Sequence, residues 1–502
     1  MALLRIGRLL PHRTRRPARW LYRRLPFWWR AGDTLRSTYA FLEESQHWSR
    51  EQTLRYQTSK LKEVVRHAGE NVPGYRDRFA GHGVGPEDIR SLDDIRRLPC
   101  LTKEDLQRTP AAYAAENIAK ELLEYVTSGG TTGRPTGFYH IRSYNHEVAA
   151  AYRLMMWKRV GYKPDARALD LTASFDGEPV QYAPETRTLY VSISALSSRQ
   201  FKACVDRIND FRPQFIFGFP STVTLLAQLA GEHTLSTDSV RAIITASEVM
   251  YDSQRSCISD VFGCRIFSWY GMAEYAAFAS GCERSDQYHF FPESGCLEIL
   301  DEGGDPVTEE GGEGEIVLTG FHNLATPFIR YRTGDRGVLG KPRCDLCGRN
   351  HQLVKTISGR TQEFLVAQDG RLIPNSALNV HSDIFDHVWM YQFHQQAPGK
   401  VRLDIVGKPA CGAASIERIR DTMLRKLGPG VDLDISLVEK IKRTKRGKHR
   451  FIVQRLEKSA VEMDTSLGCA SPFKKTLGPG LERAIGDSGL GNCRDLLGRD
   501  HE

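Results

Sequence analysis

The spacing of hydrophobic positions predicts that the folded part of the chain starts with helices. Between residues 41 and 125, apolar side chains recur every three or four positions, most clearly in REQTLRYQTSKLKEVVRHAGENV, which then meets Pro73 and Gly74. Ser91 and Thr102 indicate two further helix starts, because each hydroxyl residue precedes acidic residues in a capping pattern. We therefore expect several helices before the first strand.

The pattern changes near residue 126, where short apolar runs replace the helical repeat. ALDLTAS, RTLYVSIS, FIFGF, AIITAS and CRIFSWYG are rich in β-branched or aromatic residues and are bounded by turn residues. They alternate with helical segments, which predicts a mostly parallel sheet within a large α/β domain of mixed sheets covered by helices.

A second change, near Ser358, marks a smaller domain. Residues 360–457 hold alternating stretches such as VRLDIVG and VDLDISLVE around one helix, SIERIRDTMLRKLG, which is typical of a small α+β domain. The Gly- and Ser-rich tail predicts disorder. We expect a basic leader at residues 1–40 and a large domain at residues 41–357. A small mobile C-terminal domain would follow at residues 358–457, and a disordered tail at residues 458–502.

The formal net charge of the 502-residue chain is +8, and its distribution matters more than its size. Residues 1–30 contain nine arginines and no Asp, Glu or Lys. Subtracting these nine charges from +8 leaves a formal net charge of −1 for the rest of the chain. A near-neutral body disfavours general nucleic-acid binding. Because the leader mixes arginine with leucine, tryptophan and phenylalanine, it suits either a helix on an anionic membrane surface or an unstructured start.

Other signals bear on the compartment. No run approaches the roughly 18 apolar residues of a membrane span, and the leader lacks the apolar core of about 7 to 15 residues that a secretory signal needs. Eleven cysteines are too sparse for a disulfide framework, so reduced thiols are expected. We expect a cytoplasmic protein, with a peripheral contact at the inner membrane surface if the leader binds lipid.

Residues 125–139, YVTSGGTTGRPTGFY, predict a loop because glycine, proline and hydroxyl side chains at this density suit neither a helix nor a central strand. Such a loop offers backbone N–H groups and hydroxyls to phosphate oxygens. The Walker pattern is absent because no lysine follows Gly133. On these residues alone, a phosphate cradle and an ordinary surface loop are equally open.

Five segments together resemble the motifs of the adenylate-forming superfamily, which includes acyl-CoA synthetases, adenylation domains and luciferases. In chain order they are SGGTTGRPTG, WYGMAE, RYRTGD, SGRTQEFLV and RTKRGKHR, at 128–137, 269–274, 330–335, 358–366 and 443–450. Within the superfamily, ENVPGYRDRF, SLDDIRRLPCLTKEDL and CDLCGRN resemble the phenylacetate-CoA ligase and CapK-like branch. The resemblance covers residues 45 to 457.

The resemblance implies that the chain activates a small carboxylic acid with ATP, forming an acyl-adenylate and pyrophosphate. Coenzyme A is the simplest acceptor, and a hydroxyl or amine of a glycan precursor is the alternative, since CapK-like proteins occur in capsule and polysaccharide biosynthesis. Catalysis would rest on positioning and on electrostatic stabilisation of phosphoryl oxygens. ATP, Mg²⁺ and coenzyme A are thus the expected cofactors.

Residue roles follow from position within the resembling motifs. Glu274 would bind Mg²⁺ and Lys448 would reach the α-phosphate, so these are the expected catalytic residues. Gln362 would be the hinge between two domain orientations. The expected nucleotide-binding residues are Ser128, Gly129, Gly130, Thr131, Thr132 and Gly133 at the β- and γ-phosphates, Tyr270 at adenine, Asp335 at ribose, Gly271, and Arg360, for which a salt bridge is the alternative.

Three positions depart from the family pattern. Ala273 stands where Thr or Ser is usual, Gln362 stands where Asp or Lys is common, and Gly130 is an extra glycine in the loop. These departures keep open a second interpretation, in which the chain is a non-catalytic or degenerate scaffold in polysaccharide biosynthesis.

The acid-binding pocket is less well marked. It is expected on segments near 168–196, 217–223 and 244–250, where Phe175, Phe219 and Glu248 are candidates. His140 and His322 are interpreted as local hydrogen-bonding residues, because adenylation requires no strong base.

Cys344 and Cys347 have the spacing that lets two thiolates bind one zinc ion. Cys282 and His289 would complete a closed Cys₃His structural site, with Cys296 as a substitute ligand. Phenylacetate-CoA-ligase-like proteins carry a similar arrangement. The alternative is that these are unrelated buried residues.

Overall fold

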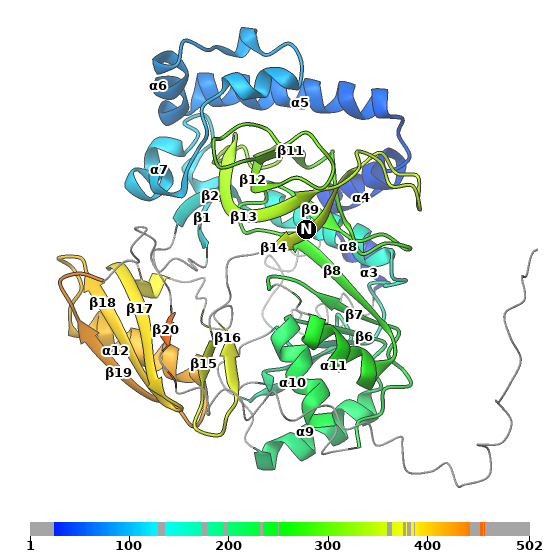
Figure 1. Ribbon diagram of the computed structural model, residues 1–502, viewed down its shortest axis with the longest axis vertical. Coiled ribbons are helices and arrows are strands. Elements are labelled where there is room, and N and C mark those ends of the chain that lie inside the picture. Colours follow the sequence, from blue (N-terminus) through cyan, green and yellow to red (C-terminus); the bar gives the residue numbers. More distant parts are fainter. Residues whose placement is uncertain are drawn as a thin grey trace, which may run out of the picture.

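The computed structural model describes most of the chain from residue 25 to residue 456 (Figure 1). The described residues are 25–128, 136–172, 178–193, 198–230, 234–248, 250, 252–358, 364–374, 378, 383–385, 387–441, 452–454 and 456. The predicted tail and most of the predicted leader therefore lie outside the described residues.

In the described part of the chain, the first helices are α3 (Phe27–Arg30), α4 (Asp33–Ser45), α5 (Arg50–Asn71) and α6 (Pro73–Gly81). α5 begins in a capping box, in which the Ser49 hydroxyl accepts from the backbone N–H of Gln52 and the Gln52 side chain accepts from that of Ser49. α5 ends before Pro73, which opens α6, so the predicted break lies where Pro73 and Gly74 indicated it. α4 packs against α8 (Tyr144–Lys158) through Leu42.

The two predicted helix starts have different outcomes. Thr102 begins α7 (Lys103–Arg108), in a reciprocal cap with Asp105. Ser91 instead precedes a short 3₁₀ helix, η2 (Asp93–Arg97), because the Asp94 carboxylate accepts from the backbone and hydroxyl of Ser91 within a tight turn. The remaining short 3₁₀ segments of this region are η1 (Pro86–Asp88), η3 (Pro110–Tyr113) and η4 (Lys120–Leu122).

The large domain is built around a mixed sheet, which has twelve strands in the described part of the chain, in the order β11-β12-β13-β14-β10-β9-β8-β7-β6-β3-β5-β4. The strands are β3 (Ala168–Asp170), β4 (Val180–Ala183), β5 (Thr188–Val191), β6 (Phe215–Gly218), β7 (Ala242–Thr245), β8 (Arg265–Gly271), β9 (Phe278–Ser280), β10 (Tyr288–Phe290), β11 (Gly295–Leu300), β12 (Glu313–Gly320), β13 (Tyr331–Leu339) and β14 (Gln352–Ser358).

The two halves of this sheet differ in strand direction. β5, β3, β6, β7 and β8 pair in parallel, whereas β9 to β14 and the edge strand β4 pair antiparallel. α9 (Ser198–Phe211), α10 (Pro220–Ala230) and α11 (Asp252–Phe262) lie together beside the parallel half (Figure 1). Every residue of β7 is buried, as expected of a central strand covered on both faces. The predicted α/β class with helix-covered mixed sheets is confirmed.

The smaller sheet has the order β19-β18-β17-β20. It comprises β17 (Val388–Ala397), β18 (Lys400–Gly407), β19 (Asp432–Leu437) and β20 (Ile452–Gln454), packed with α12 (Ala413–Leu427) and η7 (Asp383–Phe385). The hairpin of β15 (Phe364–Val366) and β16 (Leu372–Pro374) adds Leu365 and Ile373 to the same core. These elements form the yellow and orange unit of Figure 1, an α+β arrangement as predicted.

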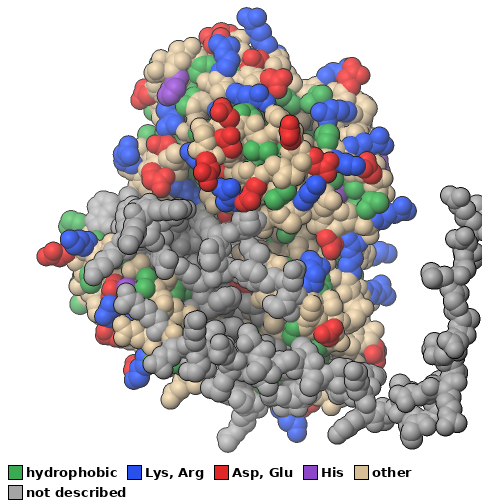
Figure 2. Space-filling view, in the orientation of Figure 1, with side chains coloured by type: hydrophobic (Ala, Val, Ile, Leu, Met, Phe, Trp, Pro, Cys, Tyr) green, Lys and Arg blue, Asp and Glu red, His purple; other side chains and the backbone are tan. Residues whose placement is uncertain are grey.

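The surface and helices add two observations. Side chains of both charge signs are interspersed over the visible face of the large domain (Figure 2), in keeping with its near-neutral sequence. Of the helices that the structure describes, none combines the length and apolar character needed to cross a membrane.

Candidate active site and metal centre

Two of the predicted motifs meet through Glu274 and Tyr331. Glu274 lies in the turn after β8, Tyr331 opens β13, and both side chains are buried. The Tyr331 hydroxyl donates to Glu274 Oε1 over 2.9 Å. Burial raises the pKa of the Glu274 carboxyl, whereas the backbone of Glu274 and the Tyr331 hydroxyl lower it. Tyr331 therefore stabilises the charged form of a buried carboxylate.

A second hydrogen bond joins the same two motifs, and here the tyrosine comes from the first motif and the carboxyl group from the second. The Tyr270 hydroxyl, at the end of β8, donates to Asp335 Oδ2 over 2.9 Å. Burial raises the pKa of the Asp335 carboxyl to about 6, and the Tyr270 hydrogen bond opposes this shift. Each motif thus supplies one tyrosine to the carboxyl group of the other, which fixes the two carboxyl groups relative to each other.

Gly271 is positioned by its neighbours. Tyr270 and Gly271 pair with Ala279 and Phe278 of β9. A Cβ atom at position 271 would lie 2.7 Å from the ring of Trp269, so a side chain there would displace that ring.

The phosphate-loop segment is flanked by β1 (Leu123–Ser128) and β2 (Thr136–Ile141), an antiparallel hairpin in which Ser128 lies opposite Thr136. Gln107 of α7 donates to the Thr136 hydroxyl over 3.0 Å and so anchors one end. The predicted residues that lie outside the described ones are Gly129, Gly130, Thr131, Thr132, Gly133, Phe175, Arg360, Gln362 and Lys448.

Two of the residues predicted for the acid-binding pocket lie just beyond the carboxyl ends of neighbouring strands. Phe219 and Glu248 follow the carboxyl ends of the adjacent parallel strands β6 and β7. Ligands of open α/β sheets bind outside the carboxyl ends of the strands, so this position is consistent with a pocket.

The two histidines differ. His322 Nε2 lies 2.8 Å from the Tyr152 hydroxyl, so its interpretation as a hydrogen-bonding residue is confirmed. His140 is 1% exposed and stacks on Tyr275 with ring centroids 4.7 Å apart. Burial is the main cause that lowers the pKa of His140 to about 4, and an interaction with the backbone of Ala273 raises this pKa in opposition.

The predicted metal ligands come together. One donor atom from each of Cys282, His289, Cys344 and Cys347 lies within 4.8 Å of all the others. Cys282 follows β9, His289 belongs to β10, and the two remaining cysteines lie in the connection from β13 to β14. Neither ring nitrogen of the buried His289 has a hydrogen-bond partner among the described residues. Three sulfurs and one imidazole nitrogen at this spacing fit a tetrahedral zinc ion.

Two of the cysteines interact with each other. The Cys282 thiol donates a hydrogen bond to the Cys347 sulfur, which lowers the pKa of Cys347 and raises the pKa of Cys282, so the two sulfurs share one proton when no metal is bound. Cys296, the predicted substitute ligand, lies instead in β11 within the hydrophobic core of the large domain.

Comparison with known proteins identifies the family to which these motifs belong. The family model of AMP-binding enzymes matches residues 86–326, and that of the CapK C-terminal domain matches residues 365–455. Phenylacetate-coenzyme A ligase of Escherichia coli (strain K12) is 30% identical over 355 residues, covering 66% of this chain and 76% of that protein. The chain belongs to the AMP-binding enzyme family.

More distant similarities extend over more of this AMP-binding enzyme. Protein CapK of Staphylococcus aureus is 21% identical over 420 residues, covering 80% of this chain and 89% of that protein. The crystal structure of 2-hydroxyisobutyryl-CoA ligase in the postadenylation state with R3-HIB-AMP has a TM-score of 0.55 at 22% identity, covering 85% of this chain and 94% of that chain. The likeness to that structure shows a shared fold.

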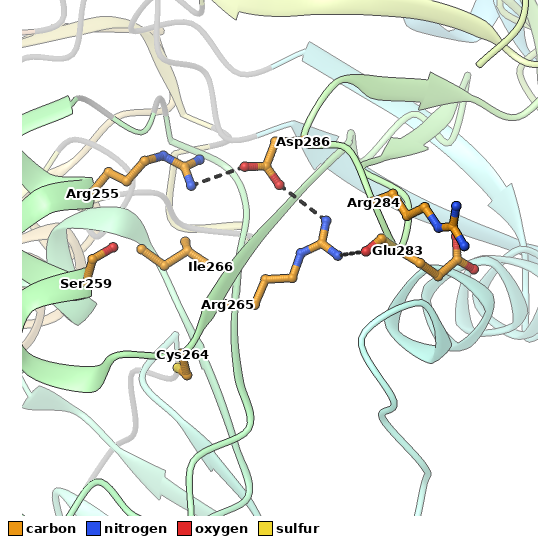
Figure 3. Close-up of a pocket in the computed structure, with 8 residues that line it drawn as sticks. All are labelled: Arg255, Ser259, Cys264, Arg265, Ile266, Glu283, Arg284 and Asp286. Carbon is orange, nitrogen blue, oxygen red and sulfur yellow. Dashed lines mark hydrogen bonds and ion pairs between the residues drawn. The ribbon is translucent and has the colours of Figure 1, made fainter. Parts of the chain in front are cut away.

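The loop that carries Cys282 is fixed from β8 in this AMP-binding enzyme. Arg265 donates to the carbonyl oxygens of Cys282 (2.5 Å) and Glu283, and its guanidinium and that of Arg255 both pair with Asp286 (Figure 3). Arg255, Arg265 and Asp286 are among the residues that line a polar cavity of about 390 Å³. The cavity lies at the amino end of β8, whereas Tyr270 lies toward its carboxyl end, so it is separate from the candidate active site.

Sequence reasoning missed three residues near these sites. Tyr331 lies inside the RYRTGD motif, which was the available signal. Arg159 and His351 are buried beside the metal ligands, with the His351 and His289 ring centroids 6.0 Å apart. No motif or spacing in the sequence marks either one.

Proposed function

We propose that this AMP-binding enzyme joins a carboxylic acid to coenzyme A at the expense of ATP. In the first step, a carboxylate oxygen bonds to the α-phosphorus while the bond to the pyrophosphate oxygen breaks. In the second step, the sulfur of coenzyme A bonds to the acyl carbon, AMP leaves, and the thiol proton is released. The names of the phenylacetate-coenzyme A ligases, of which this chain covers about three quarters, support this acceptor.

The observation that carries the proposal is the reciprocal pairing of two tyrosines with two carboxyl groups. Asp335, held by Tyr270, would accept from the ribose hydroxyls of ATP. Glu274, held by Tyr331, offers the hard carboxylate oxygen that Mg²⁺ prefers. When bound, the ion would neutralise charge on the phosphate oxygens. The hydrogen bonds keep both carboxyl groups oriented before ATP arrives, which lowers the cost of organising the site.

The remaining roles rest on the motifs. The loop residues 128–133 would bind the β- and γ-phosphates, Lys448 and Arg360 would contact the nucleotide, and Gln362 would be the hinge. The cluster of Cys282, His289, Cys344 and Cys347 would hold a structural zinc ion, because four protein ligands leave no open coordination position for catalysis.

ATP–pyrophosphate exchange tests the adenylation step. Purified protein is assayed against aryl, short-chain and hydroxy acids, with Glu274→Gln as the control variant. We expect one acid to stimulate exchange and the variant to lose it. If the protein binds ATP but no acid stimulates exchange, and the acids tested include glycan-linked ones, the result would favour the degenerate scaffold that Ala273 and Gln362 suggest.

The acceptor is tested separately. With the stimulating acid, coenzyme A should convert the acyl-adenylate to a thioester and release AMP, which chromatography with mass detection resolves. The similarity to Protein CapK motivates the rival acceptor, a hydroxyl or amine of a polysaccharide precursor. If the acyl-adenylate forms but coenzyme A does not convert it to a thioester, the result would favour the alternative acceptor.

We also propose that the N-terminal part of the chain contacts an anionic membrane surface. Trp28 and Trp29 of α3 are 37% and 71% exposed, and the arginine-rich leader precedes them directly. α3 is fixed to the body by Arg30, which donates to the carbonyl oxygen of Glu185 over 2.9 Å. The full chain should therefore cosediment with phosphatidylserine vesicles. A Trp28→Ala/Trp29→Ala variant that binds these vesicles as well as wild type contradicts this contact.

A further inference from the structure

A buried arginine beside the metal cluster has no carboxylate partner in the described part of the chain. Arg159, just after α8, is 6% exposed. Its Nη1 atom donates to Ser280 Oγ over 3.1 Å and to the carbonyl oxygen of Gly281 over 2.9 Å. Its Nε and Nη2 atoms have no hydrogen-bond partner among these residues, and its guanidinium lies 4.6 Å from the ring centroid of Phe291. A buried charge in this state is costly unless another charge balances it.

The nearby carboxylates form no ion pair with Arg159 among the described residues. Glu283 accepts from both terminal nitrogens of Arg349, over 2.7 and 2.8 Å. Glu293 accepts from the Ser45 hydroxyl at Oε1 over 2.6 Å, and its Oε2 has no hydrogen-bond partner in the described part of the chain. Glu283 attracts the Arg159 guanidinium without contacting it, and the neighbouring Arg349 repels it.

The metal cluster offers the missing charge. Gly281, which accepts from Arg159, directly precedes Cys282. The sulfurs of Cys282 and Cys347 attract the guanidinium, as Glu283 does, whereas Arg349 repels it. A zinc ion bound by three thiolates and one neutral imidazole carries one net negative charge. Glu283 already neutralises Arg349, the other guanidinium beside the cluster, so the single positive charge of Arg159 would balance the centre.

We propose that Arg159 is the counter-charge of the metal centre and that it positions Cys282 through the carbonyl group of Gly281. The inference rests on the zinc site proposed above. It assigns Arg159 an electrostatic and positioning role, and a metal-free protein would contain a buried guanidinium without its balancing charge.

Three variants test this role. Arg159→Met removes the charge and keeps much of the side-chain volume, Arg159→Lys keeps the charge, and Arg207→Met alters an exposed arginine on α9 as a matched control. Zinc affinity of the full chain is measured by competition with a chromophoric chelator. We expect Arg159→Met to lower the affinity about 10- to 100-fold, as loss of a residue that supports metal ligands does. Arg207→Met should leave it unchanged, and Arg159→Lys should retain most of it.

Thermal unfolding with and without zinc gives a second readout. Removing zinc should lower the melting temperature more in wild type than in Arg159→Met, because the variant has no buried charge to leave unbalanced. Equal zinc affinity in wild type and Arg159→Met, or equal loss of melting temperature, would overturn the proposal. So would a folded Arg159→Lys protein, checked by circular dichroism, that binds zinc as weakly as Arg159→Met. A wild-type protein that binds no zinc would overturn the metal site itself.

Discussion

Tyr331→Phe isolates the effect of one hydroxyl group on the Glu274 carboxylate. The ring and its burial are kept, and the 2.9 Å hydrogen bond to Oε1 is lost. Hydrogen bonds to charged groups contribute about 1.5–3 kcal/mol, which corresponds to a roughly 10- to 100-fold change in rate. We therefore expect kcat/KM of ATP–pyrophosphate exchange to fall by about that factor.

The pH profile makes this prediction specific. The Tyr331 hydroxyl lowers the pKa of Glu274, against the larger raising effect of burial. Removing the donor disfavours the charged carboxylate, so the pKa rises further and the acidic limb of the activity profile moves to higher pH.

Tyr75→Phe is the matched control, because the buried Tyr75 hydroxyl donates to the carbonyl oxygen of Pro327 over 2.8 Å, within the hydrophobic core. It should lower stability without moving the acidic limb. If Tyr331→Phe leaves the limb in place, or if both variants move it equally, the assigned role of Tyr331 is wrong.

Three other predictions concern the binding site, the metal and the core. Because burial raises the pKa of Asp335 to about 6, ATP binding measured by calorimetry should weaken as the pH falls through about 6 and the carboxyl group takes up a proton. Asp335→Asn should bind ATP weakly without this pH dependence. Cys344→Ser should lose zinc in metal analysis, whereas Cys296→Ser should keep it, since Cys296 lies in the core. Glu298→Gln should lower the free energy of unfolding in denaturant titrations by about 3–5 kcal/mol, because it leaves the buried Arg330 without the partner that it contacts at 2.9 Å.

Sequence patterns identified segments more successfully than the contacts between them. Helical periodicity and a capping pattern located α5 and the start of α7, because both signals depend on residues close in sequence. The same kind of pattern at Ser91 led to a 3₁₀ turn, since a hydroxyl followed by acidic residues caps either geometry. The order of the motifs indicated which segments form a site. It did not reveal that Tyr331 contacts Glu274, because that contact depends on how strands far apart in sequence are arranged in the sheet.

The metal ligands illustrate the same limit. Spacing marked Cys344 and Cys347, and local composition added Cys282 and His289. The charge of Arg159 could not be assigned from sequence, because an arginine at the end of a helix is usually exposed and nothing nearby in the chain marks its burial.

The sheet connects the metal centre to the candidate nucleotide site through one short strand. In β9, Ser280 lies between Trp269 of β8 and the ligand His289 of β10, and the preceding residue, Ala279, pairs directly with Tyr270. A metal ion that holds His289 therefore also fixes the strand beside the tyrosine that bonds Asp335. We expect chelation under conditions where the protein stays folded to weaken ATP binding. Zinc, when restored, should recover it. If metal-free, folded protein binds ATP with unchanged affinity, the pairing of β8, β9 and β10 holds Tyr270 without help from the metal, and the centre serves stability alone.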